Sequence, residues 1–455
     1  MENNLPRAEL AALLRLAAPL MLAQLTQMGM GVADAVMAGH VSATDLAGVT
    51  LGGNAYWPVL MLVSGVIMAL TPTIAQLHGA GRQDAVGEVV RQGLWLALAG
   101  GILMVIFLNT IWPLYHWLGV DARAIPVARA YQHALSWGVM ASLGFFCLRY
   151  LCEGMSWTKP SMFIAFTALP AKIALNYVFI NGLFGLPAMG GAGCGWSSAV
   201  VGWGQLTAMA SIVAFSRLKS VGVFARFSAP DPGQLGRLIR LGVPIGLSTF
   251  LEMAVFSFTT LLIGRISVEA VAAHQIAMNV GGLTFMLPMG VGMAAAIRVG
   301  YNVGAGDLSA ARRSGWLAIG VAAGFAVFAA ALVLLARAWI AAQYTPDVAV
   351  QALAVQLMFY VAVFQLFDDT QTTAIGSLRG FKDTRTPMWV ALFAYWGVGF
   401  PVAAVLGLGL AGFPELGLEG FWIGLTVGLG VASVALVTRY RGLSRDAERI
   451  RRLAG

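Results

Sequence analysis

The sequence predicts an all-α integral membrane protein, with twelve transmembrane helices in two pseudo-symmetric six-helix lobes around a central cavity. Three observations lead to this prediction: an apolar composition, long runs without charge and an internal repeat. Of the 455 residues, 59% are hydrophobic and only 11% are charged, whereas about a quarter of the residues of a soluble domain are charged. The mean hydropathy of +0.79 therefore places the chain among membrane proteins.

Runs without a charged residue indicate where the membrane helices lie. Residues 92–120, 314–336, 386–414 and 420–438 contain no Asp, Glu, Lys or Arg, and about 20 helical residues suffice to cross the hydrocarbon core of a bilayer. These windows are too long and too evenly apolar for the strands of a membrane barrel, so we expect helices. Twelve windows can be drawn, near residues 14–40, 51–76, 92–117, 130–152, 161–181, 192–216, 238–264, 276–299, 314–338, 350–376, 387–411 and 418–440.

Lys and Arg are distributed unevenly over the expected loops. Of 28 basic residues, Lys172 is in the middle of a window, and four lie beside loops that follow odd-numbered windows: Arg123, Arg129, Arg265 and Arg337. The others lie near the N-terminus, beside loops after even-numbered windows and in the C-terminal tail. Because basic loops stay on the cytoplasmic side, both termini are expected there. The net charge of +8 then mostly reflects topology and a solvated cytosolic face, with membrane lipid as a partner for the Arg-rich tail, and no nucleic-acid partner is expected.

An internal repeat sets the domain organisation. One constant shift along the chain places LLRLAAPL (13–20) on LIRLGVPI (238–245), and the loop 79–81 on 304–306, without a gap. Each half holds six windows, so the halves should be related by an axis along the membrane normal. The predicted parts are an N-terminal lobe (1–216), a cytoplasmic linker (217–234), a C-terminal lobe (235–440) and a basic tail (441–455). Pro19 and Pro244 coincide in the repeat, which predicts a bend shared by both lobes.

Five Asp, Glu, Lys or Arg residues lie deep inside the apolar windows, about six or more residues from either end: Asp34, Lys172, Glu252, Asp368 and Asp369. Charged groups at membrane depth are costly and by default indicate a functional site. We therefore interpret Asp34, Glu252, Asp368 and Asp369 as candidate ion-coupling residues. Because Asp368 and Asp369 are adjacent, their side chains project about 100° apart on a helix and cannot face one site equally.

Glu252 is the strongest candidate for a drug site. Apolar surroundings favour the neutral, protonated form of a carboxyl group, so Glu252 could exchange a proton for a cation. Aromatic and Met neighbours supply adaptable apolar and cation–π contacts. The predicted lining of the substrate cavity consists of Phe250, Glu252, Met253, Phe256, Gln365 and Gln371.

Several segments together resemble one family of transporters. They are QMGMGVADAVMAGHVSATDLAGV (27–49), AQLHGAGRQ (75–83), GMSWTKP (154–160), AAHQIAMN (272–279), IRVGYNVGAGD (297–307) and GSLRGFKDTRTP (376–387). In their order and spacing they resemble the MATE family of multidrug and toxin extrusion transporters, in its bacterial NorM branch. The resemblance implies an inner-membrane antiporter that exports organic cations and amphipathic drugs in exchange for H⁺ or Na⁺. It also implies ion-coupling roles for Asp34, Glu252 and Asp368, with Asn176 assisting Asp34.

Two positions depart from the family pattern, and both bear on the coupling ion. Lys172 stands where relatives of this branch have asparagine, and Phe364 stands where they have tyrosine. Na⁺ prefers oxygen ligands, which an ammonium and a phenyl ring do not supply. Burying one charge alone would cost several kcal/mol, so we expect Lys172 to pair with Asp34. H⁺ is then the favoured coupling ion, and a Na⁺ site at Glu252 and Asp368 remains the alternative.

Other function classes lack their signatures. The glycine loops at 79–81 and 304–306 lack the Gly-Lys-Ser/Thr of a nucleotide-binding loop, so no nucleotide is expected. The scattered His and Cys residues show no metal spacing, so no metal or cofactor is expected. We expect a monomer and no enzyme activity. The alternative function is a flippase for lipids or lipid-linked precursors, which would favour a cationic cavity, whereas the charges here are mostly acidic.

Overall fold

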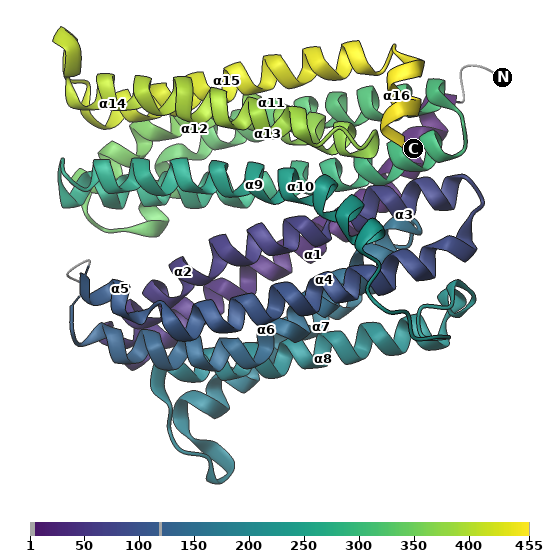
Figure 1. Ribbon diagram of the computed structural model, residues 1–455. Helices are drawn as coiled ribbons and strands as arrows, with labels where there is room; N and C mark the ends of the chain where they lie inside the picture. The colour runs from purple at the N-terminus through teal and green to yellow at the C-terminus, as the bar shows by residue number, and fades with distance from the viewer. Residues whose placement is uncertain (1–4, 118–120, 455) are drawn as a thin grey trace. The chain divides into compact units, whose positions relative to one another are not determined.

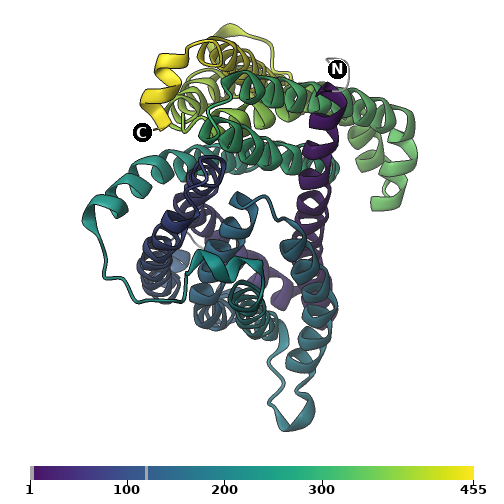
Figure 2. The same ribbon diagram turned by 90° about the vertical axis from the view of Figure 1, so that its right-hand side faces the viewer.

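A computed structural model describes residues 5–117 and 121–454. Within these residues all regular secondary structure is helical (Figures 1 and 2). In the part of the chain that the structure describes, twelve helical segments are long and apolar enough to cross a membrane. The predicted fold class of twelve membrane helices is confirmed, and most segments extend several residues beyond the predicted windows.

The first half of the chain forms six spans. They consist of α1 (Leu5–Val41), α2 with α3 (Ala43–Ile67 and Leu70–Gly79), α4 (Gln83–Thr110), α6 (Ala124–Gly154), α7 (Lys159–Asn181) and α8 (Gly193–Phe215). Short helices lie between them: α5 (Trp112–Trp117), η2 (Leu183–Gly185), η3 (Gly190–Ala192) and η4 (Arg217–Val221).

The second half forms six more spans. They consist of α9 (Pro232–Ile263), α10 (Val268–Gly304), α11 (Leu308–Tyr344), α12 (Val348–Gly380), the series α13 (Arg385–Ala391), η5 (Leu392–Gly399) and α14 (Phe400–Leu408), and α15 (Gly417–Leu443). The turn η6 (Leu410–Gly412) precedes α15, and the short helix α16 (Ala447–Ala454) follows it.

The internal repeat reappears as repeated local structure. Ser42 and Ser267, which coincide in the repeat, both begin a second span with extended backbone. Each serine hydroxyl accepts a hydrogen bond from the backbone N–H three residues later. The N–O distance is 2.9 Å from Asp45 to Ser42 and 3.0 Å from Ala270 to Ser267. Gly81 and Gly306 end the same spans with φ of 71° and 81°, a backbone conformation that favours glycine. Equal capping and turn chemistry therefore produces equal boundaries in both halves.

The chain divides into two compact units, and each contains a part of both α1 and α9. One unit holds the chain up to Met21 and from Leu247 onward, and the other holds Leu22–Gly246. The two dividing points also coincide in the repeat, because each lies just beyond one of the matched prolines, Pro19 and Pro244. Within Leu22–Gly246, α6 packs against α2, α4 and α8, and within the other unit α12 packs against α10, α11 and α15 (Figure 1).

Matched glycines let helices approach closely in both units. A Cβ added at Gly65 of α2 would lie 2.4 Å from the Cα of Gly246, and one added at Gly290 of α10 would lie 2.6 Å from the Cγ of Met21. Gly65 corresponds to Gly290 in the repeat, and Met21 corresponds to Gly246. Each contact therefore joins the second span of one half to the first span of the other half.

We expect Gly65→Ala to destabilise the protein by about 1–3 kcal/mol, because the new methyl group would overlap backbone that side-chain motion cannot relieve. Gly282→Ala in α10 is the matched control, since no atom lies within 4 Å of its added Cβ and alanine favours helix. Thermal unfolding of both purified variants measures the effect. An equal unfolding midpoint for the two variants would contradict close packing at Gly65.

Candidate functional site

Lys172 and Asp34 form a buried ion pair inside the unit Leu22–Gly246, as predicted. The Nζ of Lys172 lies 2.9 Å from Oδ1 of Asp34, and the two residues are 2% and 8% exposed. Asn176, one turn after Lys172 on α7, donates from Nδ2 to the same carboxylate oxygen at 2.8 Å. The Asp34 carboxylate thus has both an opposite charge and a hydrogen-bond donor, the conditions under which a buried charge is tolerated.

The start of α8 supplies further acceptors for the ammonium group. Lys172 donates to the carbonyl oxygen of Cys194 at 2.7 Å, to Oγ of Ser197 at 2.7 Å and to Oγ of Ser198 at 2.5 Å. Ser197 also donates to Oδ1 of Asn176. Sequence reasoning missed these three acceptors. With them the ammonium is surrounded by oxygen atoms, which explains how a lysine lies far from either end of its span without reaching the membrane surface.

A small cavity adjoins the ion pair. It has a volume of about 80 Å³ and is lined by Asp34, Lys172 and Ser198, together with Gln27, Gln205 and several aromatic rings. The Nε2 atom of Gln205 is buried and has no hydrogen-bond partner among the described residues. A cavity of this size and polarity holds a few water molecules, whereas a drug-sized molecule needs several hundred cubic ångströms. The cavity therefore suits water and protons.

A second cluster joins three spans of the other unit. Gln371 of α12 donates from Nε2 to Oδ1 of Asp368 at 3.1 Å and lies 3.3 Å from Oε1 of Glu252 on α9. The hydroxyl of Tyr395 lies 2.8 Å from Oε1 of Gln371 and 3.4 Å from Oε1 of Glu252. Gln371 therefore connects the two carboxyl groups, and the fold brings Glu252, Asp368 and Gln371 together from two distant spans.

Tyr395 is a member of this cluster that the sequence analysis missed. It lies in η5, where the chain forms a π-helix between α13 and α14. The N–H of Phe400 bonds to the carbonyl oxygen of Tyr395, five residues earlier, and the next residue is Pro401, which has no N–H to continue the usual pattern. A π-helical turn changes which side chains share a helix face and is frequent at functional sites. The signal in the sequence was a polar tyrosine before a proline in an apolar span.

Charge compensation differs between the two clusters. At Asp34 the compensating charge is the adjacent ammonium of Lys172, whereas the positive charge that acts on Glu252 is that of Arg379, in the last turn of α12. The Phe364 ring, one turn before Asp368, lies between Phe256 at 5.9 Å and Trp422 at 5.7 Å between ring centroids. This side of Asp368 therefore presents aromatic carbon.

The other residues predicted to line the substrate cavity differ in their contacts with this cluster. Gln365 donates to Thr284 and does not bond to either carboxyl group. Phe250, Met253 and Phe256 lie on α9 and are partly buried. Of these three, Phe256 has a ring contact with a residue of α12, through Phe364.

Asp369 differs from its neighbour Asp368. It is completely buried, and neither carboxyl oxygen has a hydrogen-bond partner among the described residues. An ionised carboxylate without a donor or a cation would be strongly disfavoured there. The neutral, protonated carboxyl group is the form that this environment tolerates.

We therefore expect Asp369→Asn to retain transport at roughly the wild-type rate, within about twofold, because the amide resembles the neutral carboxyl group in size and charge. Asp368→Asn, one residue earlier, should lose most of its activity, because Asp368 belongs to the hydrogen-bonded cluster. Efflux assays on reconstituted protein compare the two variants. Equal loss in both would place Asp369 among the groups that release a proton during transport.

Comparison with known proteins identifies the family. A family model described as MatE matches residues 19–178 and 244–405, two stretches that begin at the matched prolines, Pro19 and Pro244. The chain is 42% identical over 431 residues to "Probable multidrug resistance protein NorM" of Xanthomonas axonopodis, covering 94% of this chain and 93% of that protein. It is also 42% identical over 453 residues to "Multidrug resistance protein PmpM" of Pseudomonas aeruginosa, covering 97% and 93%.

A solved structure has the same fold. The crystal structure of the eukaryotic MATE transporter AtDTX14 superimposes with a TM-score of 0.88, covering 98% of this chain and 99% of that chain at 22% identity. The resemblance stated from the sequence motifs is thus confirmed by a match to both halves and by relatives over nearly the full length. The chain belongs to the MATE family of membrane transporters.

Proposed function

We propose that this protein is a multidrug efflux antiporter, which exports organic cations and amphipathic drugs in exchange for inward H⁺ by alternating access. The names of its relatives, multidrug resistance proteins with about 40% identity, support the substrate class. The internal repeat supports alternating access, because transporters built from two related repeats commonly work by a rocking motion of those repeats. No nucleotide or other cofactor enters this proposal.

The observation that carries the proposal is the cluster of Glu252, Gln371 and Asp368. Two carboxyl groups share one amide, and the positive charge of Arg379, in the last turn of α12, acts on one of them, Glu252. Such a pair is best stabilised by protons or by a cationic ligand. A cationic drug and H⁺ would therefore compete for the same carboxyl groups, which couples their movements in opposite directions.

The choice of H⁺ over Na⁺ rests on both clusters. At Asp34 the ammonium of Lys172 lies at 2.9 Å, where a bound Na⁺ would otherwise lie. At Asp368 the Phe364 ring supplies no oxygen ligand, and a hard cation prefers several oxygen ligands. Protons need only the carboxyl groups themselves, so the residues support H⁺ coupling in both lobes.

In this mechanism the cluster of Glu252, Asp368 and Gln371, which we call the C-terminal cluster, binds the drug. The ion pair of Asp34 and Lys172 exchanges protons. An ionised Glu252 attracts the cationic drug, and protonation from the outside of the membrane releases it. Aromatic neighbours such as Phe250 and Phe256, and Met253, contribute the adaptable apolar contacts. Movement of a proton onto Asp34 would break its pair with Lys172, and the polar cavity beside them provides a route for that proton.

We propose a multi-pass protein of the bacterial inner membrane, with both termini in the cytoplasm, that acts as a monomer. The orientation rests on the distribution of basic residues. In it, the linker after α8 lies in the cytoplasm, where Arg91 donates to Ser228 at 2.8 Å and to the carbonyl of Gly222 at 2.7 Å. Cysteine accessibility of single surface variants in intact cells would test this orientation.

Efflux from proteoliposomes tests the proposed function. Reconstituted protein and a fluorescent organic cation are given an H⁺ gradient or a Na⁺ gradient, each alone. We expect efflux with the H⁺ gradient and none with the Na⁺ gradient. Efflux with Na⁺ only would overturn H⁺ coupling and assign Na⁺ to the carboxyl groups of the C-terminal cluster. Absence of efflux with both gradients would overturn the drug antiporter and favour a lipid flippase.

A further inference from the structure

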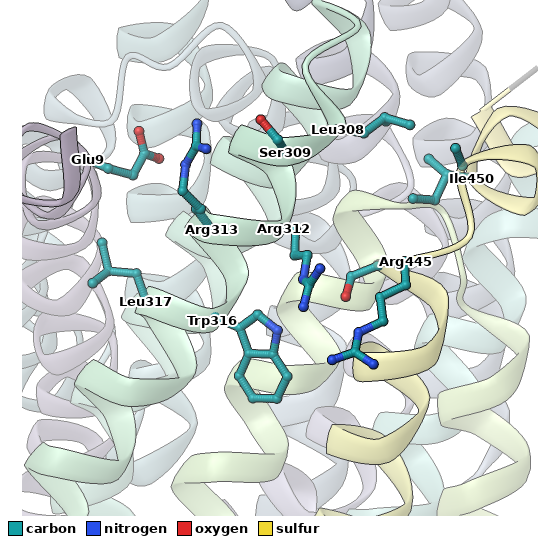
Figure 3. A pocket seen from close by; sticks show the side chains of 11 residues that line it. Glu9, Leu308, Ser309, Arg312, Arg313, Trp316, Leu317, Arg445 and Ile450 are labelled. Atoms are coloured by element: carbon teal, nitrogen blue, oxygen red, sulfur yellow. The ribbon is translucent and has the colours of Figure 1, made fainter. Parts of the chain in front are cut away.

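Three arginines line a large pocket in the unit that contains α11 and the C-terminus. The pocket has a volume of about 800 Å³, and its lining includes Arg312, Arg313, Trp316, Arg445 and Ile450. We call it the arginine pocket. Figure 3 shows Arg312, Trp316 and Arg445 between α11 and the chain that follows α15, with Arg313 on the side of Glu9.

The local sequence explains why these side chains meet. Arg312, Arg313 and Trp316 lie within the first three turns of α11. Arg312 and Trp316, four residues apart, share one helix face, and Arg313 projects about 100° away from Arg312, on the side of Glu9 (Figure 3). Tyr440 of α15 fixes this end of α11: its hydroxyl bonds to the carbonyl of Arg312 at 3.0 Å, and its ring packs edge-on against Trp316 at 5.5 Å. The pocket wall is therefore built from rigid helices.

The charge of the pocket is not balanced by the protein. Among the described residues, none of the three guanidinium groups lies within ion-pair distance of a carboxylate. Glu9 also lines the pocket, but Arg298 binds it with two contacts of 3.0 and 2.6 Å.

Two acids lie beside the lining residues Arg445 and Ala447. Asp446 accepts the backbone N–H of Arg449 at 2.9 Å, and Glu448 lies 3.9 Å from Arg452. Asp307, just before α11, is a third nearby acid. It caps the helix by accepting the N–H of Ala310 at 2.8 Å. This bond, the Ser309 hydroxyl and the charge of Arg313 hold the pKa of Asp307 below its usual value. Asp307 is thus already engaged by the helix end, and the lining of the pocket itself carries three arginines against one acid, Glu9.

The pocket lies where a span meets the membrane surface. The run without charge begins at residue 314, directly after Arg313, so the arginines precede the hydrocarbon region and Trp316 lies at its border, as interfacial tryptophans do. Beside it, α16 buries Ile450 and exposes Arg449, Arg451 and Arg452, the pattern of a short amphipathic helix at a membrane surface. Figure 1 shows α16 and the start of α1 at the same end of this unit.

We infer that the arginine pocket binds the phosphodiester head group of an anionic phospholipid. Guanidinium groups bind phosphate through two parallel hydrogen bonds, and basic pockets between membrane helices suit lipid head groups. Trp316, which is partly exposed, adds apolar surface for the glycerol backbone and the first carbons of the acyl chains, which inorganic phosphate would not use. This inference is independent of the proposed function, because it concerns a different part of the molecule.

Native mass spectrometry of the full-length protein in detergent tests the inference. Phosphatidylglycerol is the probe, phosphatidylcholine is the zwitterionic comparison and inorganic phosphate is the competitor. The pocket variant is R312Q/R313Q/R445Q. The matched control is R449Q/R451Q/R452Q, which removes three exposed charges from α16 outside the pocket lining. The lipid readout does not depend on transport activity.

We expect the pocket variant to bind phosphatidylglycerol at least about tenfold more weakly than wild type, since each basic residue near lipid contributes about 1 kcal/mol. The control variant should lose much less, and phosphatidylcholine should bind weakly to all three proteins. If the pocket variant does not fold, the single variant Arg445→Gln should weaken binding about fivefold. Equal losses of phosphatidylglycerol binding in both triple variants would show nonspecific attraction of the lipid to basic residues. That result would overturn binding at the arginine pocket. Binding of inorganic phosphate without binding of phosphatidylglycerol would replace the lipid by a free anion.

Discussion

Replacing Lys172 by methionine should destabilise the protein by about 3–5 kcal/mol at neutral pH, because the change leaves the Asp34 carboxylate buried without its opposite charge. Asp34 would keep the hydrogen bond from Asn176 at 2.8 Å but would lose the ammonium at 2.9 Å. Three oxygen acceptors on α8 would also lose their donor. The midpoint of thermal unfolding of the detergent-purified protein measures the loss.

Two further variants separate the ion pair from general damage to α7. Lys159→Met makes the same change at an exposed position of the same helix and should have little effect. The double variant Asp34→Asn/Lys172→Met removes both charges and should be more stable than Lys172→Met alone, since contacting residues do not act additively. Protonation of Asp34 would relieve the unpaired charge, so the loss in Lys172→Met should shrink at acidic pH.

The variant Lys172→Met also tests whether the ion pair takes part in transport. If the pair exchanges a proton during transport, Lys172→Met should change the pH dependence of efflux as well as its rate. An unchanged pH dependence together with unchanged stability would show that the pair is neither a coupling site nor a structural brace. Loss of stability with an unchanged pH dependence would assign the pair a structural role only.

The sequence alone predicted much of this fold because bilayer physics leaves few choices. Backbone groups inside a membrane must bond to one another, so each long apolar run had to be a helix. The matched caps at Ser42 and Ser267 and the matched turns at Gly81 and Gly306 are local chemistry that a repeat in sequence copies directly. Apolar windows do not say which neighbour a helix packs against, so the division of α1 after Met21 and of α9 after Gly246 could not be read from them.

The candidate sites were predicted in part, because charged residues are conspicuous in apolar spans and hydroxyl groups are not. Asp34 and Lys172 stood out because charge is rare in the spans, and opposite charges predicted their pairing. Ser197 and Ser198 did not stand out, since hydroxyl side chains in spans commonly bond to their own helix, as Thr207 and Ser211 do here. Tyr395 escaped prediction because a π-helical turn, η5, changes the direction of its side chain, and ordinary helical spacing does not anticipate that change.

Replacing Glu252 by glutamine should slow efflux of a cationic substrate on the order of a hundredfold. Two opposite unit charges about 4 Å apart attract with about 4 kcal/mol at an effective dielectric constant near 20. If desolvation cancels about a third of this, the remaining ~2.7 kcal/mol corresponds to about a hundredfold in affinity. The change preserves the size of the side chain and its hydrogen bonding with Gln371 and Tyr395, so the effect reports the charge of Glu252. Glu269→Gln, an exposed position at the start of α10, is the matched control and should leave efflux unchanged.

Equilibrium binding of the fluorescent cation distinguishes loss of the drug site from loss of coupling. Wild-type protein should bind the cation more weakly as the pH falls, because protons and drug compete for Glu252 and Asp368, which share the Gln371 amide. Glu252→Gln should bind weakly at every pH, with a smaller pH dependence that comes from Asp368 alone. Asp368→Asn should likewise bind the cation weakly, with a smaller pH dependence of binding that comes from Glu252 alone. Tight binding that varies with pH as in wild type in both variants would place the drug elsewhere and remove this cluster from the coupling mechanism.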